Sequence, residues 1–133
     1  MKISQRTAVL LVLACCFVHI AFAQQTIRIK IQAAPLDRHL LFDKLNDHGS
    51  SKHMAFVAVE EGFDYRVAYG TAGGPVMTPY GPASAAASVT KVFDATGAEL
   101  FEFSRNGRWT NDAAANATAK EIIKRIRKLR SSN

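Results

Sequence analysis

The feature that most limits the fold of this chain is its N-terminal segment, residues 1–23, which has the composition of an export leader. Lys2 and Arg6 precede an almost wholly apolar run, and Ala21-Phe22-Ala23 supplies the small residues that a signal peptidase requires. We expect cleavage before Gln24. Residues 24–133 are then left to fold as a single small domain.

Two alternatives to simple cleavage stay open. The apolar run 7–22 is nearly long enough to cross a bilayer as an uncleaved anchor, although no cationic stop-transfer cluster follows it. Val12-Leu13-Ala14 before Cys15 is close to a bacterial lipidation motif, although Leu13 is unusual at its position. Sequencing of the mature N-terminus separates the three outcomes.

Both cysteines, Cys15 and Cys16, lie inside this leader. For the cleaved protein this excludes a disulfide scaffold, a zinc–thiolate site, a redox motif and a cysteine nucleophile. Removing Lys2 and Arg6 also lowers the formal net charge from +6 to +4. No later stretch approaches the ~20 apolar residues that a membrane-spanning helix needs.

The N-terminal half of the domain predicts a strand, a helix and two more strands. Residues 26–32 alternate strictly between isoleucine and polar side chains, as a half-buried strand does. Pro35 begins a helix that we expect to end near His48-Gly49, with Gly49 as a left-handed cap. Residues 54–59 and 63–69 are expected to pair as antiparallel strands through a turn at Glu60-Glu61-Gly62.

Residues 70–84 are rich in glycine and proline, which predicts a long loop or flap. Strands 88–93 and 99–104 then form a hairpin around a turn at 94–97. We expect four apolar side chains to share one face of it: Val89, Phe93, Phe101 and Phe103. Asn106-Gly107 predicts another turn, followed by a short strand at 108–110.

Asn111 or Asp112 is expected to cap a last helix that runs to about Arg130. Its apolar stripe consists of Ala115, Ala119, Ile122, Ile123, Ile126 and Leu129. The order of elements predicts an α+β fold, with an antiparallel sheet of about four to five strands and two helices packed on one face.

Ser88-Val89-Thr90-Lys91 matches the Ser-x-x-Lys motif of serine β-lactamases and penicillin-binding proteins, in which lysine helps to deprotonate the serine. That chemistry requires a helix, whereas the β-branched and aromatic neighbours predict a strand. On a strand, Ser88 and Lys91 point to opposite faces. The alternative function is nevertheless a small serine hydrolase using this pair.

His39, Asp43 and Asp47 are spaced to line one helix face, with His48 and His53 nearby, but they define no closed metal shell. The glycines at 70–74 lack the lysine and the helix of a phosphate-binding loop. We therefore assign no catalytic, cofactor-binding or metal-ligating residue, expect no cofactor, and expect that the protein is not an enzyme.

The basic character of the domain is local. Residues 120–130 hold six Lys or Arg and one Glu, whereas residues 24–119 are close to neutral. Cations near a helix C-terminus offset its dipole by ~0.3–1 kcal/mol each. The outward face of this helix is also a candidate for contact with an anionic envelope polymer or the membrane surface. Nucleic acid is not expected, because export argues against it and no aromatic residue follows Trp109.

The segments EEGFDYRVAYG and VTKVFDATGAELFEFSRNG, followed by an alanine-rich final helix, resemble small bacterial envelope α/β proteins. The related group includes curli-secretion-type and penicillin-binding-protein-activator lipoproteins. The resemblance implies a non-enzymatic accessory or binding domain, periplasmic or secreted, whose partner is an envelope protein or an anionic polymer. The expected contact surface comprises the exposed sheet edge, the 70–84 segment with Tyr80, and the cationic helix face.

Overall fold

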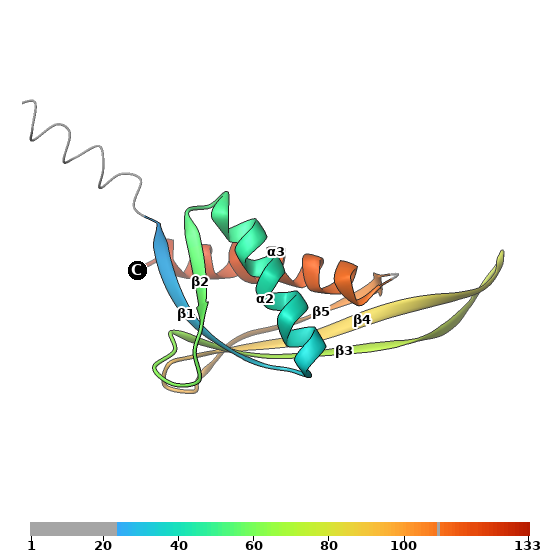
Figure 1. Ribbon diagram of the computed structural model, residues 1–133, viewed down its shortest axis with the longest axis horizontal. Coiled ribbons are helices and arrows are strands. Elements are labelled where there is room, and N and C mark those ends of the chain that lie inside the picture. The colour runs from blue at the N-terminus through green and yellow to red at the C-terminus, as the bar shows by residue number, and fades with distance from the viewer. Residues whose placement is uncertain (1–23, 109) are drawn as a thin grey trace, which may run out of the picture.

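The computed structural model describes residues 24–108 and 110–133 as one sheet covered by two helices (Figure 1). In chain order the elements are β1 (Gln25–Gln32), α2 (Pro35–Ser50), β2 (Met54–Ala58), β3 (Tyr65–Thr78), β4 (Gly81–Asp94), β5 (Glu99–Arg108) and α3 (Asn111–Ser131). The strands lie in the order β2-β1-β3-β4-β5, and both helices pack on the same face. The expected α+β class is confirmed.

The core lies between that face and the helices. The alternation in β1 turns Ile27, Ile29 and Ile31 inward, as predicted, and α2 contributes Leu41 and Leu45. The buried residues of the α3 stripe are Ala115, Ala119, Ile122, Ile123 and Ile126, whereas Leu129 at its end is exposed. Burying a side chain such as isoleucine stabilises the fold by ~1.5–3 kcal/mol, so this interface holds the helices on the sheet.

The pairing predicted between residues 54–59 and 63–69 is wrong. Strand β1 lies between β2 and β3 and is parallel to both, which makes the sheet mixed. Strand β3 begins opposite Ile29, where β2 ends, so residues 59–64 only have to cross β1. The crossing covers two strand spacings, about 10 Å, whereas six residues can span about 20 Å.

An ion pair secures this crossing. Asp64 accepts hydrogen bonds from the backbone N–H of Arg28 at 2.9 Å and from its guanidinium at 3.0 Å. Partial burial of Asp64 opposes ionisation, but these bonds outweigh it and hold the pKa of the carboxyl below its usual value. Lys30 also donates to the carbonyl of Glu60 at 3.1 Å. The polar face of β1 thus holds the loop that connects β2 to β3.

Helix α2 continues past the predicted left-handed cap. Gly49 is a buried helical residue, and the helix ends at Ser50. A Cβ atom at Gly49 would lie 2.8 Å from the carbonyl oxygen of Met54 and 3.0 Å from the ring of Phe56. Glycine is needed here because the helix end lies directly against β2. The positive φ of this region occurs instead at His53, at 56°.

The predicted turn at 94–97 joins β4 and β5. The Asp94 carboxylate accepts hydrogen bonds from the hydroxyl of Thr96 and from the backbone N–H groups of Thr96 and Ala98, and these bonds lower its pKa. The predicted common face is wrong, because Thr90 pairs with Phe103 and Val92 with Phe101. Phe101 and Phe103 therefore lie under α3, whereas Val89 and Phe93 lie on the open face.

Two boundaries near the end of the chain also differ from expectation. Asn106-Gly107 lies within β5 rather than in a turn, because β5 pairs with β4 as far as Arg108. The residue that caps α3 is Thr110, whose hydroxyl accepts a hydrogen bond from the N–H of Ala113 at 3.1 Å. The predicted strand at 108–110 includes Trp109, which lies outside the described residues.

Candidate functional site

The structure does not assemble the Ser-x-x-Lys pair. Ser88 lies on β4, as its β-branched neighbours predicted, and is buried against α3, where its hydroxyl is 2.9 Å from that of Thr118. Lys91 points to the open face and pairs with Glu102 at 3.2 Å and with Glu99 at 3.9 Å. The sheet therefore separates the hydroxyl from the amine, and they cannot act as a nucleophile and base.

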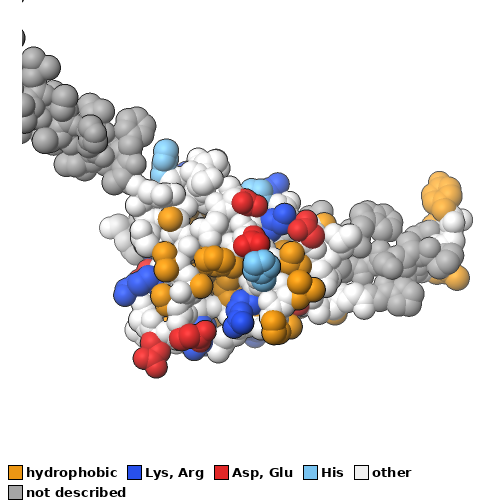
Figure 2. Space-filling view, in the orientation of Figure 1, with side chains coloured by type: hydrophobic (Ala, Val, Ile, Leu, Met, Phe, Trp, Pro, Cys, Tyr) orange, Lys and Arg blue, Asp and Glu red, His pale blue; other side chains and the backbone are white. Residues whose placement is uncertain are grey.

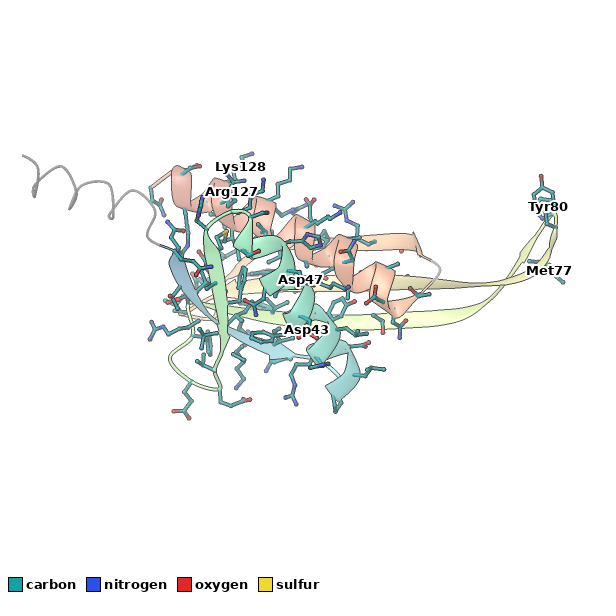
Figure 3. All side chains as sticks on the ribbon, turned by 45° about the horizontal axis from the view of Figure 1, so that its top comes forward. Asp43, Asp47, Met77, Tyr80, Arg127 and Lys128 are labelled. Carbon is teal, nitrogen blue, oxygen red and sulfur yellow. The ribbon has the colours of Figure 1, made fainter. Side chains whose placement is uncertain are left out.

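The histidines and aspartates around α2 do not converge either. The Oδ2 atom of Asp43 is 3.3 Å from Nε2 of His39, and both side chains are exposed. Asp43 and Asp47 both lie on α2 (Figure 3). His48 lies close to the side-chain oxygen of Asn116 on α3, and His53 lies in the turn after α2. Within residues 24–108 and 110–133, no group of three or more His, Cys, Asp or Glu could hold a metal ion.

The most distinctive feature of the molecule is the β3–β4 hairpin, which projects beyond the helices as an arm (Figure 1). Its strands pair continuously from Tyr65 opposite Asp94 to Thr78 opposite Gly81. The loop predicted at 70–84 is therefore wrong. Strand β1 last pairs with β3 at Ala68, and β5 last pairs with β4 at Ala86, so the arm beyond Ala86 is a ribbon of only two strands.

The base of the arm is fixed to the helices by polar contacts. Thr71 donates a hydrogen bond of 2.7 Å to Asp37 in the first turn of α2. Burial raises the pKa of the neighbouring Tyr69 to about 12, and the negative charge of Asp37 adds to this effect. On the paired strand, the contact of Ser88 with Thr118 ties β4 to α3. The arm therefore emerges from an anchored base.

Beyond Thr71, residues 72–78 carry the arm about 23 Å outward at the rise of a strand. No Asp, Glu, Lys, Arg or His occurs anywhere in residues 67–90, although charged residues make up 21% of the chain. Met77 is 83% exposed and Tyr80 is 100% exposed at the tip, where Figures 2 and 3 show hydrophobic side chains. Such side chains are typical of the centre of protein interfaces.

The prolines of the arm indicate how it could make contact. A two-stranded ribbon leaves backbone groups open along both edges, which invites pairing with another strand. Pro75 lies in β3 and Pro82 in β4, and neither can donate a backbone hydrogen bond. Strand addition along these edges is therefore impaired. The exposed side chains at the tip are therefore better suited to contact with another molecule than the strand edges are.

No protein-family model matches the sequence, and no curated protein matches it. Solved structures to which the chain is similar include the following three. A minor lipoprotein from Acinetobacter baumannii has 10% identity and a TM-score of 0.47, with 77% of this chain and 94% of that one covered. A DUF330-family protein from Xanthomonas campestris has 12% identity and a TM-score of 0.47, with coverage of 76% and 84%.

The third structure is a dodecamer of a PelC variant from Paraburkholderia phytofirmans, at 12% identity and a TM-score of 0.42, with coverage of 74% and 80%. None of the three is named as a curli-secretion protein or a penicillin-binding-protein activator, so that narrower resemblance stays a prediction. Identities and TM-scores at this level assign neither an activity nor a partner to this chain.

The cationic helix divides into two parts. In its middle, Glu121 accepts hydrogen bonds from Arg125 at 2.8 Å and from Arg105 at 2.6 Å, and these contacts lower the pKa of Glu121. Arg125 also lies over the stacked rings of Phe101 and Phe103. The cations of the last turns lie beyond these contacts, at the end of the helix.

Among the described helices, none has the length and apolar character needed to cross a bilayer.

Proposed function

We propose that this protein is an exported, non-enzymatic binding module of the bacterial envelope, and that the tip of the β3–β4 arm is its contact with a partner protein. The observation that carries this proposal is the projection of an uncharged ribbon whose end exposes Met77 and Tyr80. Transferring a methionine side chain from water into an apolar pocket contributes ~1.5–3 kcal/mol. The partner therefore has an apolar pocket of matching size.

Three features support binding rather than catalysis. The serine and lysine that suggested a hydrolase lie on opposite sides of the sheet. The hydrogen bond between Thr71 and Asp37 fixes the base of the arm, so the arm leaves the domain in a defined direction. The absence of charge in residues 67–90 lowers the cost of removing the arm from water.

The test is site-specific photo-crosslinking in the producing bacterium. A photoreactive residue at position 80 is compared with one at position 36, because Leu36 is also exposed, at 64%, but lies on α2. We expect a discrete crosslinked protein from position 80 alone. Substituting Met77→Ser should abolish that product, whereas Val57→Ser, on the exposed part of β2, should leave it unchanged. Equal crosslinking from positions 80 and 36 contradicts the proposal.

The export part of the proposal has its own measurement. Intact mass of the protein isolated from the envelope should correspond to a chain that begins at Gln24. A mass that includes Met1 would show that the leader is retained. A mass that begins at an acylated Cys15 would show a lipoprotein.

A further inference from the structure

The end of α3 opposite the arm forms a hollow lined by positive side chains. Its volume is about 580 Å³, and it lies between the turn after α2, the start of β1 and the last turns of α3. The lining residues are Gln25, Lys52, His53, Met54, Arg127, Lys128, Arg130 and Ser131. The lining contains two lysines, two arginines and a histidine, and it contains no carboxylate side chain.

Helix dipoles offset only part of the positive charge that Lys and Arg bring to this hollow. Lys128 and Arg130 lie in the last turn of α3, where positive charge offsets the helix dipole. Lys52 comes from a different element, the turn that directly follows the C-terminus of α2. The C-termini of α2 and α3 together contribute only about one negative charge, against four formal positive charges from Lys and Arg. The hollow is therefore strongly positive.

Contacts within the described residues hold one wall of the hollow in place and leave three of its Lys and Arg side chains without an acidic partner. Arg130 donates to the hydroxyl of Tyr65 at 3.4 Å, with its guanidinium over that ring. Within residues 24–108 and 110–133, Lys52, Arg127 and Lys128 have no carboxylate within ion-pair distance. All three side chains are exposed.

The turn that supplies Lys52 is itself fixed to β1. His53 has a positive φ of 56°, and it is the single non-glycine residue of the described chain in this conformation. Its carbonyl accepts a hydrogen bond of 2.7 Å from the N–H of Gln25. This bond joins the turn to the start of β1, and the end of α3 forms the remaining wall of the hollow. Backbone strain of this kind is often retained at binding sites.

We propose that this hollow binds a phosphate group of the kind carried by anionic lipid headgroups. Two or three lysine and arginine side chains can donate charge-assisted hydrogen bonds to the oxygens of one phosphate. The start of β1 lines the hollow, so the chain enters the folded domain at this end of the molecule. The tip of the arm lies at the opposite end, where Figure 3 shows Tyr80 far from Arg127 and Lys128. A domain bound to a membrane in this way directs its arm away from the surface.

The test compares two double variants that remove the same charge. The first variant, Lys52→Gln with Lys128→Gln, removes two lysines that line the hollow. The second variant, Lys120→Gln with Lys124→Gln, removes two exposed lysines of α3 that lie outside it. Lys120 and Lys124 line a neighbouring hollow together with the acidic Glu121, so they serve as matched controls. Co-sedimentation is measured with vesicles of 30% phosphatidylglycerol in phosphatidylcholine and with vesicles of phosphatidylcholine alone. The second set corrects for any insertion of residues 1–23.

We expect the protein to prefer the anionic vesicles. The variant of the hollow should bind them about 30-fold more weakly, since each lysine near an anionic surface contributes about fivefold. The control variant should bind within about threefold of the original protein. Substituting Met77→Ser in the arm should leave binding unchanged, which separates this site from the proposed partner contact. An equal loss in both double variants would overturn the proposal, because it would show diffuse attraction to the helix.

A titration with inorganic phosphate, followed by amide chemical shifts, distinguishes the source of the phosphate. Shifts at Lys52 and His53 together with vesicle binding support a lipid headgroup. Shifts without vesicle binding support the phosphate site but overturn its assignment to lipid, and indicate a soluble phosphate ligand. The absence of both shifts and vesicle preference overturns the site. The urea midpoints of both variants confirm that they are folded.

Discussion

Substituting Gly49→Ala provides a sharp test of how α2 is seated on the sheet. In an unconstrained helix, alanine is more favourable than glycine by ~1 kcal/mol. Here the new methyl group would lie 2.8 Å from the Met54 carbonyl oxygen and 3.0 Å from the Phe56 ring. The carbonyl belongs to the backbone of β2, which is paired with β1, so it cannot rotate away.

The expected magnitude follows from these two opposing effects. Overpacking of a buried site costs about 1–3 kcal/mol. A contact with fixed backbone belongs at the upper end of this range, and subtracting the ~1 kcal/mol of helix propensity leaves a destabilisation of about 1–2 kcal/mol. Urea unfolding followed by far-UV circular dichroism measures this difference. Ser50→Ala is the matched control, because Ser50 is exposed and its hydroxyl bonds only to the carbonyl of Asp47 in its own helix.

A second substitution distinguishes close packing from a left-handed cap. Asparagine is tolerated at left-handed positions, so Gly49→Asn would be milder than Gly49→Ala if the residue were such a cap. The structure predicts the opposite order, because asparagine is larger. A Gly49→Ala protein that is more stable than the original would refute the seating of the helix.

Two further predictions concern the sheet and the last helix. Ser88→Ala should destabilise the fold by ~1 kcal/mol, because it leaves the buried hydroxyl of Thr118 without its partner. Adding Thr118→Ala should restore part of this loss. Additive losses in urea unfolding would show that the two hydroxyls are not coupled. The hydrogen bond from Arg125 lowers the pKa of Glu121 in the folded protein. The ionised Glu121 carboxylate therefore contributes stability above its unfolded pKa of about 4.3, and this contribution is lost as pH falls through the lower folded value. Urea midpoints between pH 6 and pH 3 should therefore decline less steeply in Glu121→Gln, and an identical decline in both proteins would contradict this origin.

The periodicity of the sequence was a reliable guide to the buried faces of β1 and α3. The alternating isoleucines of β1 and most of the stripe of α3 lie in the core as expected, because these patterns directly record which side chains avoid water. The same reasoning correctly separated Ser88 from Lys91. The side-chain period of a strand puts residues three apart on opposite faces, whatever the neighbours of that strand are.

The arm was not predicted, because the glycines and prolines of its sequence are typical of a loop. Whether such residues fit into a strand depends on which neighbouring strands that strand pairs with. Glycine and proline normally interrupt strands, and residues 70–84 contain both in quantity. In a two-stranded ribbon, half of the backbone groups of each strand point to solvent, so a proline can be accommodated where no bond is lost. The absence of charge from residues 67–90 was the one available hint.

The sequence by itself determined the inward faces of β1 and α3, the order of most elements, the concentration of positive charge at the end of the chain, and the absence of cysteine after residue 16. Only the tertiary structure decided that β1 lies between β2 and β3, and that Lys52 and Lys128 line one hollow. The physical reason is that burial patterns are local to each element. Which elements become neighbours depends on contacts between residues far apart in the chain, and no periodicity encodes those contacts.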